Sequence, residues 1–396
     1  MLEKALTGSR GYWAWLASLA VLIAIGFAAW LHQLDVGLAV TGLGRDVSWG
    51  LYIAQFTFLV GVAASAVMVV LPYYLHDCRA FARVTILGEL LAVAALVACA
   101  LFILVDMGQP ARVLNVLLYP SPGSLMFWDM LALGGYFVLN VLIAWVTLSA
   151  ERRDEPAPRW IRPIVLLSIP WAIGIHTVTA FLYAGLPGRS FWLTAVLAPR
   201  FLASAFAAGP ALLILVSLIL RQVARFDIGR QALDTLAVIV AYATIANVFF
   251  LLMELFTAFY SGIPEPAAHF QYLFAGLDGH RGLVPWMWTS AGLTLGALTL
   301  LVVPRLRRNE RLLAAAAAAV FVALWIDKGL VLIVAGFVPT PFDQVVDYAP
   351  TTIENLISIG IWATGTLLVT VCFKVVIAVR GDVMASGGAS SAPTTL

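Results

Sequence analysis

Residues 101–112 read Leu-Phe-Ile-Leu-Val-Asp-Met-Gly-Gln-Pro-Ala-Arg, an apolar run that ends in the carboxylate of Asp106 and then in turn-forming residues. After a Pro/Gly/Ser break at 120–124, the next apolar run carries a second carboxylate, Asp129, near its start. A run of about 20 apolar residues is long enough to cross a bilayer as a helix. We therefore expect two neighbouring membrane helices joined by a loop, with one acid just inside the mouth of each.

The same pattern of long apolar runs divided by turns recurs along the whole chain. Of its 396 residues, 62% are hydrophobic and 11% are charged, whereas a soluble globular protein carries about 25% charged residues. The sequence therefore predicts an all-α integral membrane protein, with residues 1–396 forming a single membrane domain. The Gly-, Ala-, Ser- and Thr-rich tail at 381–396 is expected to be disordered. Ten transmembrane helices are expected, at residues 12–31, 48–74, 83–105, 124–148, 161–185, 199–220, 232–260, 284–303, 312–336 and 352–379.

Charge in the connections predicts how the helices are oriented. Most of the 23 Lys and Arg residues lie in connections on the side of the two termini, and positively charged connections stay in the cytoplasm. Both termini are therefore expected in the cytoplasm, in a multi-pass protein of a bacterial or archaeal cytoplasmic membrane. The outer connections are rich in Pro, Gly and aromatic residues, which suggests a docked partner, although such loops also occur for structural reasons. These connections are residues 32–47, 106–123, 186–198, 261–283 and 337–351.

Asp106 and Asp129 lie near the outer face, where an acid inside a membrane helix is costly and usually functional. A quinone headgroup exchanges two protons together with two electrons, so it needs proton donors or acceptors and a path to water. A partly buried carboxylate can do this, and we assign the two acids the catalytic role. Two structural alternatives stay open. Asp129 can complement a helix macrodipole, and Asp106 can form a salt bridge to Arg112.

The second span begins with a polar and aromatic face. Trp49, Tyr52 and Gln55 are three residues apart, so they share one side of a helix near the outer surface. We expect this side to form the wall of a cofactor pocket, although Trp49 can instead belong to an aromatic belt at the membrane interface. Gln109 and Arg112, which follow Asp106, are expected to bind at the same site.

Other ionisable residues fall within the spans and are candidates for a proton path. Glu89 can instead pair with an arginine of an inner loop. Glu254, Asp327 and Lys328 can instead neutralise one another, because a buried charge without a partner is strongly destabilising. The candidates for the proton path are Glu89, His176, Glu254, Asp327, Lys328 and Glu354.

The sequence contains no pattern typical of a metal site. Cys78, Cys99 and Cys372 are far apart, whereas an iron–sulfur cluster needs several closely spaced cysteines. The five His residues form no metal motif and suit no bis-His haem. No basic patch interleaved with aromatic residues is present. We therefore expect no metal, haem or iron–sulfur cluster held by this chain, and no nucleic-acid partner.

Several of these segments resemble the NrfD/PsrC family of quinone-interacting membrane subunits. The resemblance extends over about residues 10–380, and within the family the chain is most similar to the DsrP-type subunits of DsrMKJOP complexes. The matching motifs are Ser-Trp-Gly-Leu-Tyr-Ile-Ala at 48–54, Leu-Val-Asp-Met-Gly-Gln-Pro at 104–110, the stretches 176–189 and 198–211, and Val-Pro-Trp-Met-Trp at 284–288.

The resemblance implies a layout and a set of partners. Two four-helix bundles are expected, at 48–185 and 198–336, with a first helix and outer loop at 11–47 and a last helix at 352–379. A quinone, either menaquinone or ubiquinone, would bind in the first bundle near the periplasmic face. Some family members place a His in that pocket, and here Gln55 is expected to fill its role.

The implied partners are subunits of one redox complex embedded in membrane lipid. They are a periplasmic iron–sulfur protein resembling DsrO, a cytochrome c protein resembling DsrJ, and DsrM- and DsrK-like subunits. The expected function is electron exchange between quinone and the iron–sulfur subunit in dissimilatory sulfur metabolism, with oxidoreductase activity only within the complex. Two other classes stay open, namely an ion- or proton-translocating subunit or secondary transporter, and a structural anchor for soluble redox subunits.

Overall fold

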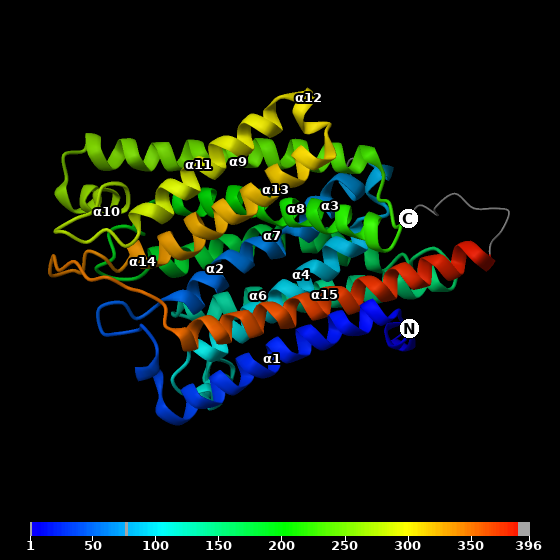
Figure 1. The fold of residues 1–396 in the computed structure, drawn as a ribbon, viewed down its shortest axis with the longest axis horizontal. Coiled ribbons are helices and arrows are strands. Elements are labelled where there is room, and N and C mark those ends of the chain that lie inside the picture. The colour runs from blue at the N-terminus through cyan, green and yellow to red at the C-terminus, as the bar shows by residue number, and fades with distance from the viewer. Residues whose placement is uncertain (1, 76–77, 387–396) are drawn as a thin grey trace.

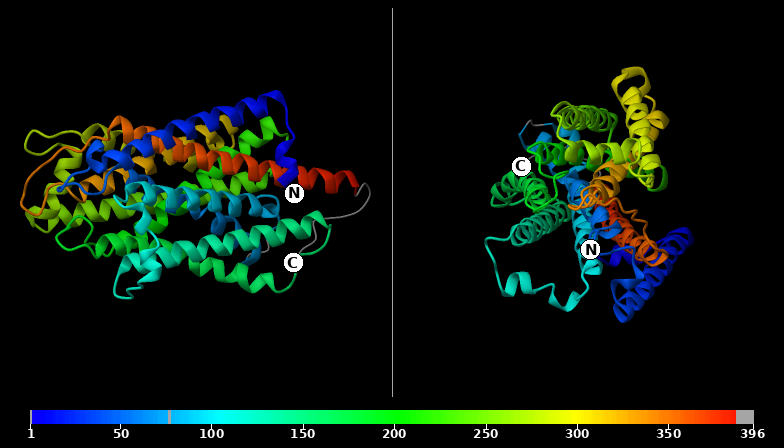
Figure 2. Two further views of the ribbon diagram at one scale, coloured as in Figure 1. Left: turned by 90° about the horizontal axis from the view of Figure 1, so that it is seen from below. Right: turned by 90° about the vertical axis from the view of Figure 1, so that its left-hand side faces the viewer.

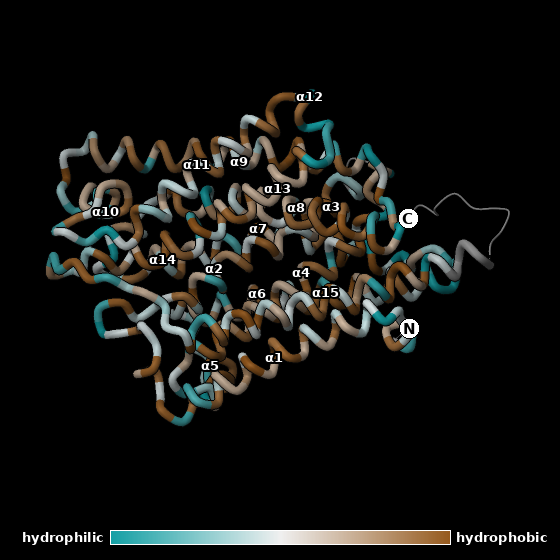
Figure 3. Tube along the Cα trace, in the orientation of Figure 1, coloured by the Kyte–Doolittle hydropathy of each residue, from teal (hydrophilic) through white to brown (hydrophobic). Residues whose placement is uncertain are grey.

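The computed structural model describes residues 2–75 and 78–386. Within these residues, ten helical segments are long and apolar enough to cross a membrane. They run side by side along one elongated molecule (Figure 1), with hydrophobic residues along their length and hydrophilic residues gathered towards the two ends (Figure 3). The chain is therefore a multi-pass membrane protein, and no strand longer than an isolated bridge between Leu277 and His280 occurs in its described part.

The helices follow the predicted order. The membrane-spanning segments are α1 (Arg10–Val36), α2 (Leu51–Ala63) with α3 (Ser65–Leu75), α4 (Thr85–Asp106), α6 (Leu125–Arg152), α7 (Ile161–Ala184), α8 (Leu197–Val223), α9 (Arg230–Tyr260), α11 (Val284–Val302), α13 (Glu310–Leu324) with the π-helical η5 (Trp325–Val331) and α14 (Leu332–Ala335), and α15 (Thr352–Ser386). Short helices in the connections are η1 (Leu2–Leu6), η2 (Leu38–Val40), η3 (Arg79–Phe81), η4 (Pro110–Arg112), α5 (Asn115–Leu118), α10 (Pro264–Phe274) and α12 (Pro304–Arg307).

The two ends of the molecule differ. The N-terminus and the last described turns of α15 lie at one end, whereas the long connections lie at the other (Figures 1 and 2). We call the second end the loop end. It comprises the connections 37–50, 107–124, 185–196, 261–283 and 336–351.

The second span lies at the centre of the molecule. Every residue from Leu51 to Val70 is buried, as expected for a helix that is hydrophobic on all sides. α2 contacts α4, α7, α8, η5 and α15. The chain of contacts continues from α4 to α6 and α7 on one side, and from α8 to α9, α11 and α13 on the other, while α1 packs on α15 at the edge.

A break at Ala64 divides the second span where α8 crosses it. A Cβ atom added to Gly209 of α8 would lie 2.7 Å from the backbone nitrogen of Ser65, so only glycine fits at this crossing. The hydroxyl of Ser65 donates to the carbonyl of Gly88 in α4, 3.2 Å away. Small residues therefore bring three helices together at this point, as they commonly do in membrane proteins.

Two segments differ from the predicted layout. The last helix was expected to end at 379 but continues to Ser386, so residues 381–386 of the predicted disordered tail are helical, and 387–396 lie outside the described residues. The ninth span contains the seven-residue π-helical segment η5. Such segments often occur at functional sites because they change the direction of neighbouring side chains.

Candidate functional site

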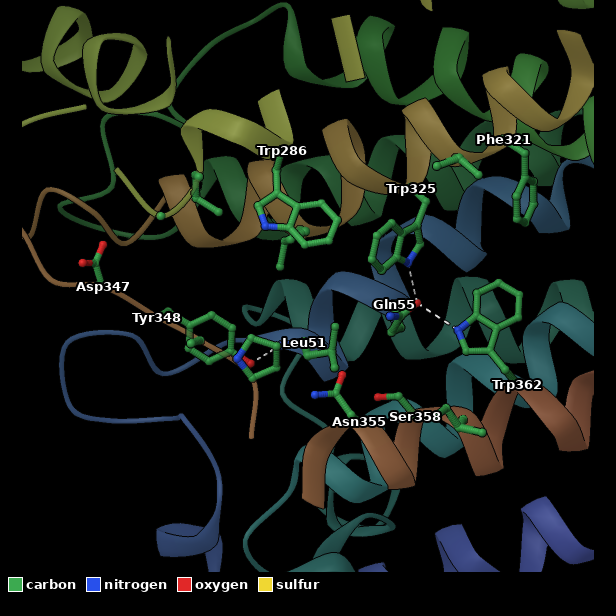
Figure 4. A pocket seen from close by; sticks show the side chains of 17 residues that line it. Leu51, Gln55, Trp286, Phe321, Trp325, Asp347, Tyr348, Asn355, Ser358 and Trp362 are labelled. Carbon is green, nitrogen blue, oxygen red and sulfur yellow. Dashed lines mark hydrogen bonds between the residues drawn. The ribbon is translucent and has the colours of Figure 1, made fainter. Parts of the chain in front are cut away.

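A cavity of about 910 Å³ lies towards the loop end, between α2, α11, α13, η5 and α15 (Figure 4). Aromatic side chains form much of its wall. Four of them are Trp286, Phe321, Trp325 and Trp362, which come from four of these elements, and Leu51 and Gln55 line it from α2. The cavity is therefore apolar with few polar groups, which is the usual composition of a small-molecule site.

Gln55 is the central polar residue of this wall. Its amide oxygen accepts a hydrogen bond from the indole nitrogen of Trp325 at 2.8 Å and another from that of Trp362 at 3.0 Å. Because an indole nitrogen can only donate, the atom that faces both rings must be the oxygen. The amide orientation is thus fixed by the neighbours, and the amide nitrogen remains to donate to a ligand.

The cavity is open along part of its side. Val322 and Ile359 line it and are 42% and 47% exposed, and Trp286 is 42% exposed. All three lie on helices long and apolar enough to cross a membrane, so we expect this opening to face lipid. A hydrophobic molecule dissolved in the bilayer could then enter the cavity from the side.

At the loop end, Tyr348 closes the inner wall of the cavity. Its hydroxyl donates to Glu354 at 2.7 Å and accepts from the backbone nitrogen of Leu51 at 2.7 Å. Burial, followed by the charge of Glu354, raises the pKa of the Tyr348 phenol. Tyr348 therefore stays protonated and holds the start of α2 against the start of α15.

Glu354 has a clear structural role at this place. Its carboxylate accepts from the backbone nitrogens of Thr351 at 2.9 Å and of Gly42 at 2.7 Å, and the Thr351 hydroxyl accepts from the nitrogen of Glu354 at 3.3 Å. This reciprocal pair is a capping box at the start of α15. The Thr-x-x-Glu spacing at 351–354 is the local sequence signal of such a box, and the predicted proton-path role of Glu354 overlooked it.

The two aromatic residues predicted beside Gln55 do not line the cavity. The Tyr52 hydroxyl donates to the amide oxygen of Gln33 at 2.6 Å, and Gln33 donates to the carbonyl of Val105 at 2.7 Å. Trp49 packs against the rings of Tyr183, Trp192 and Phe337. Tyr52 therefore links α2 to α1. Trp49 lies in the connection before α2, so the three residues predicted to share one helix face do not do so.

Asp106 and Asp129 lie near the loop end but outside the cavity lining. Asp129 is 4% exposed and accepts a 2.6 Å hydrogen bond from the Thr179 hydroxyl of α7. Asp106 ends α4, and one of its oxygens is buried without a hydrogen-bond partner in the part of the chain that the structure describes. Gln109 and Arg112 are exposed, and among the described residues no salt bridge joins Asp106 to Arg112.

Glu89 and His176 are buried groups with unused hydrogen-bonding atoms. Glu89 of α4 is 1% exposed, and one of its oxygens has no hydrogen-bond partner within residues 2–75 and 78–386. His176 of α7 is fully buried, and neither ring nitrogen has a hydrogen-bond partner among the described residues. Their predicted place in a proton path stays a prediction.

Two further candidates for the proton path, Glu254 and Asp327, meet at an arginine of α8. The guanidinium of Arg200 donates to Glu254 at 2.5 Å and to Asp327 at 2.7 Å. The ammonium of Lys328 instead lies 3.2 Å from the carbonyl of Phe201 and over its ring. The cation that neutralises both acids is thus Arg200, which is only 6% exposed. In the sequence, Arg200 stands directly before the apolar run of α8. This placement was the signal from which a buried arginine could have been predicted.

Comparison with known proteins places this chain in a family. The family described as "Polysulphide reductase, NrfD" matches residues 39–340. The chain belongs to the NrfD family. Within the described residues of this NrfD-family chain, no group of three or more His, Cys, Asp or Glu is placed to hold a metal ion.

Relatives of this NrfD-family chain are similar along much of their length. One is described as a candidate membrane subunit of a dimethyl sulfoxide reductase from Halobacterium salinarum, with 29% identity over 90% of this chain and 89% of the relative. An Hdr-like menaquinol oxidoreductase integral membrane subunit of Archaeoglobus fulgidus is 24% identical over 61% of this chain and 60% of the relative. A menaquinone reductase integral membrane subunit of Nitratidesulfovibrio vulgaris is 22% identical, with 91% and 90% covered.

Proposed function

We propose that this chain is the quinone-binding membrane subunit of a respiratory redox complex, and that the quinone headgroup binds at Gln55. The observation that carries the proposal is the amide of Gln55, whose oxygen is held by Trp325 and Trp362. Its nitrogen is left to donate to a carbonyl oxygen in an apolar cavity. A quinone presents two such carbonyl oxygens on a flat, apolar ring.

The dimensions and opening of the cavity support a quinone as the ligand. A volume of about 910 Å³ falls within the usual range for small-molecule sites, about 300–1,000 Å³. The opening beside Val322 and Ile359 suits an isoprenoid tail that remains in the lipid. Two of the relatives are named for menaquinol or menaquinone chemistry, which favours menaquinone over ubiquinone.

The proposed partners lie on the loop end. The positive-inside rule favours a cytoplasmic location for the opposite end, because its connections are basic, so the loop end would face the periplasm. There an iron–sulfur subunit resembling DsrO would exchange electrons with the quinone, as part of a complex with DsrJ-, DsrM- and DsrK-like subunits. The same proposal includes a role in dissimilatory sulfur metabolism and the assignment as a DsrP-type subunit. It also includes an arrangement in two four-helix bundles, α2–α7 and α8–α13.

A binding measurement tests the proposal. Gln55→Leu keeps the apolar wall but removes the hydrogen-bond donor. The lost hydrogen bond is worth about 1 kcal/mol, so the affinity for quinone should fall about fivefold. Binding of a short-chain menaquinone to the purified chain would be followed by quenching of tryptophan fluorescence, because three tryptophans line the cavity. Gln231→Leu, an exposed position outside the cavity lining, is the matched control. Absence of binding to the unaltered chain would refute the proposal, and equal binding by both variants would remove Gln55 from the site.

A second candidate function is proton or ion translocation, either alone or coupled to quinone chemistry. It is favoured by the buried cluster of Arg200, Glu254 and Asp327 and by the unpartnered His176. The assembled complex in liposomes with an internal pH-sensitive dye would respond to quinol-driven turnover if protons cross. A secondary transporter would instead move solute without any quinol.

A further inference from the structure

The outer mouth of the cavity holds a carboxylate and an imidazole in direct contact. Asp347 lines the cavity from the connection before α15, and its carboxylate lies 2.7 Å from the Nδ1 atom of His280. Their side chains are 51% and 37% exposed. Figure 4 shows Asp347 at the end of the cavity remote from Gln55, with Trp286 and Tyr348 between them. The pair therefore links the cavity to water at the loop end.

The other carboxylate near this wall is not available for such a link. Glu354 is fully buried, and its two oxygens accept from Tyr348, Thr351 and Gly42. A proton taken up there would weaken the capping box, and the carboxylate itself does not contact water. Asp347, in contrast, is half exposed and bonded to a side chain that can carry a proton further.

The surroundings of the pair also contain other charged and titratable groups. Tyr272 of α10 lies against Asp347, and burial together with the charge of Asp347 raises the pKa of its phenol. Asp278 and Arg281 flank His280 in the same turn, while Tyr348 follows Asp347. Because of its raised pKa, Tyr272 stays protonated beside Asp347.

We propose that Asp347 and His280 form the proton exit of the cavity, passing protons between a bound quinol and water at the loop end. The inference rests on the proposed quinone-binding function. In the direction of quinol oxidation, the two O–H bonds of the quinol break and two C=O bonds form. The two electrons pass singly to the iron–sulfur protein, and the two protons pass in turn through the cavity to Asp347, to His280 and to water. Reduction runs the same steps in reverse.

Turnover of the assembled complex tests this route. The rate of short-chain menaquinol oxidation would be measured with ferricyanide as final electron acceptor, alongside quinone binding by fluorescence quenching. We expect Asp347→Asn and His280→Gln each to lower kcat by about 100-fold, the lower range for a general acid–base group, with KM and binding unchanged. Asp347→Glu should restore much of the rate, and added imidazole should partly restore His280→Ala.

Two control variants separate this route from its rivals. Asp343→Asn changes an exposed acid of the same connection that does not line the cavity, and it should turn over like the unaltered complex. Asp106→Asn tests a route at the end of α4. The inference is overturned if Asp347→Asn turns over at the full rate, or if only Asp106→Asn loses turnover. Either result would leave the proposed binding of quinone unaffected. If the unaltered protein binds no quinone, the proposed function fails and the inference fails with it.

Discussion

Replacing Arg200 by methionine should strongly destabilise the part of the fold built from α8, α9 and η5. Two charge-assisted hydrogen bonds, at 2.5 and 2.7 Å, would be lost. The carboxylates left behind have side chains that are only 8% and 6% exposed, so water cannot replace the guanidinium. Removing one partner of a buried ion pair costs about 3–5 kcal/mol, a large share of a typical stability of about 5–15 kcal/mol.

The loss should come from the stranded charges rather than from lost packing. The triple variant Arg200→Met, Glu254→Gln and Asp327→Asn removes those charges together with the arginine. A buried ion pair can often be replaced by neutral groups with little change in stability. We therefore expect the triple variant to recover most of the stability that Arg200→Met loses.

Unfolding in mixed detergent–SDS micelles, followed by circular dichroism, gives the comparison. Arg221→Met is the matched control, because the side chains of its pair with Glu310 are 29% and 40% exposed and such pairs contribute about 0–1 kcal/mol. This account of the cluster is wrong if the free energy of unfolding of Arg200→Met lies within about 1 kcal/mol of that of the unaltered chain. It is also wrong if the triple variant is less stable than Arg200→Met.

Two further predictions concern packing and capping. Gly209→Ala should destabilise the fold by about 1–3 kcal/mol, because its Cβ would meet the backbone of Ser65 at 2.7 Å. The control in the same unfolding assay is Gly296→Ala, because the structure describes no atom within 4 Å of the added Cβ. It should be neutral or stabilising. Equal effects of the two changes would contradict the close crossing at Gly209. Glu354→Ala should cost at least the roughly 1 kcal/mol of a lost cap and lower the thermal midpoint. An unchanged midpoint would show that the capping box does not hold the start of α15.

The sequence by itself determined the membrane class, the ten spans and their order. These follow from the length and hydropathy of each run, which are local properties, and the bilayer imposes the same minimum length on every helix. The spacing of Trp49, Tyr52 and Gln55 predicted three residues on one helix, but α2 begins at Leu51, so Trp49 lies before that helix. Only Gln55 of these lines the cavity.

Only the tertiary structure decided which helices meet. The indole partners of Gln55 lie 270 and 307 residues further along the chain, and the outer pair joins His280 to Asp347 across two connections. Arg200 likewise finds its acids on α9 and η5. Lipid tails are as apolar as a helix surface, so hydrophobicity does not say which side of a span faces a neighbour. Close crossings at glycine and the redirected side chains of η5 set those contacts, and they exist only once the helices have packed.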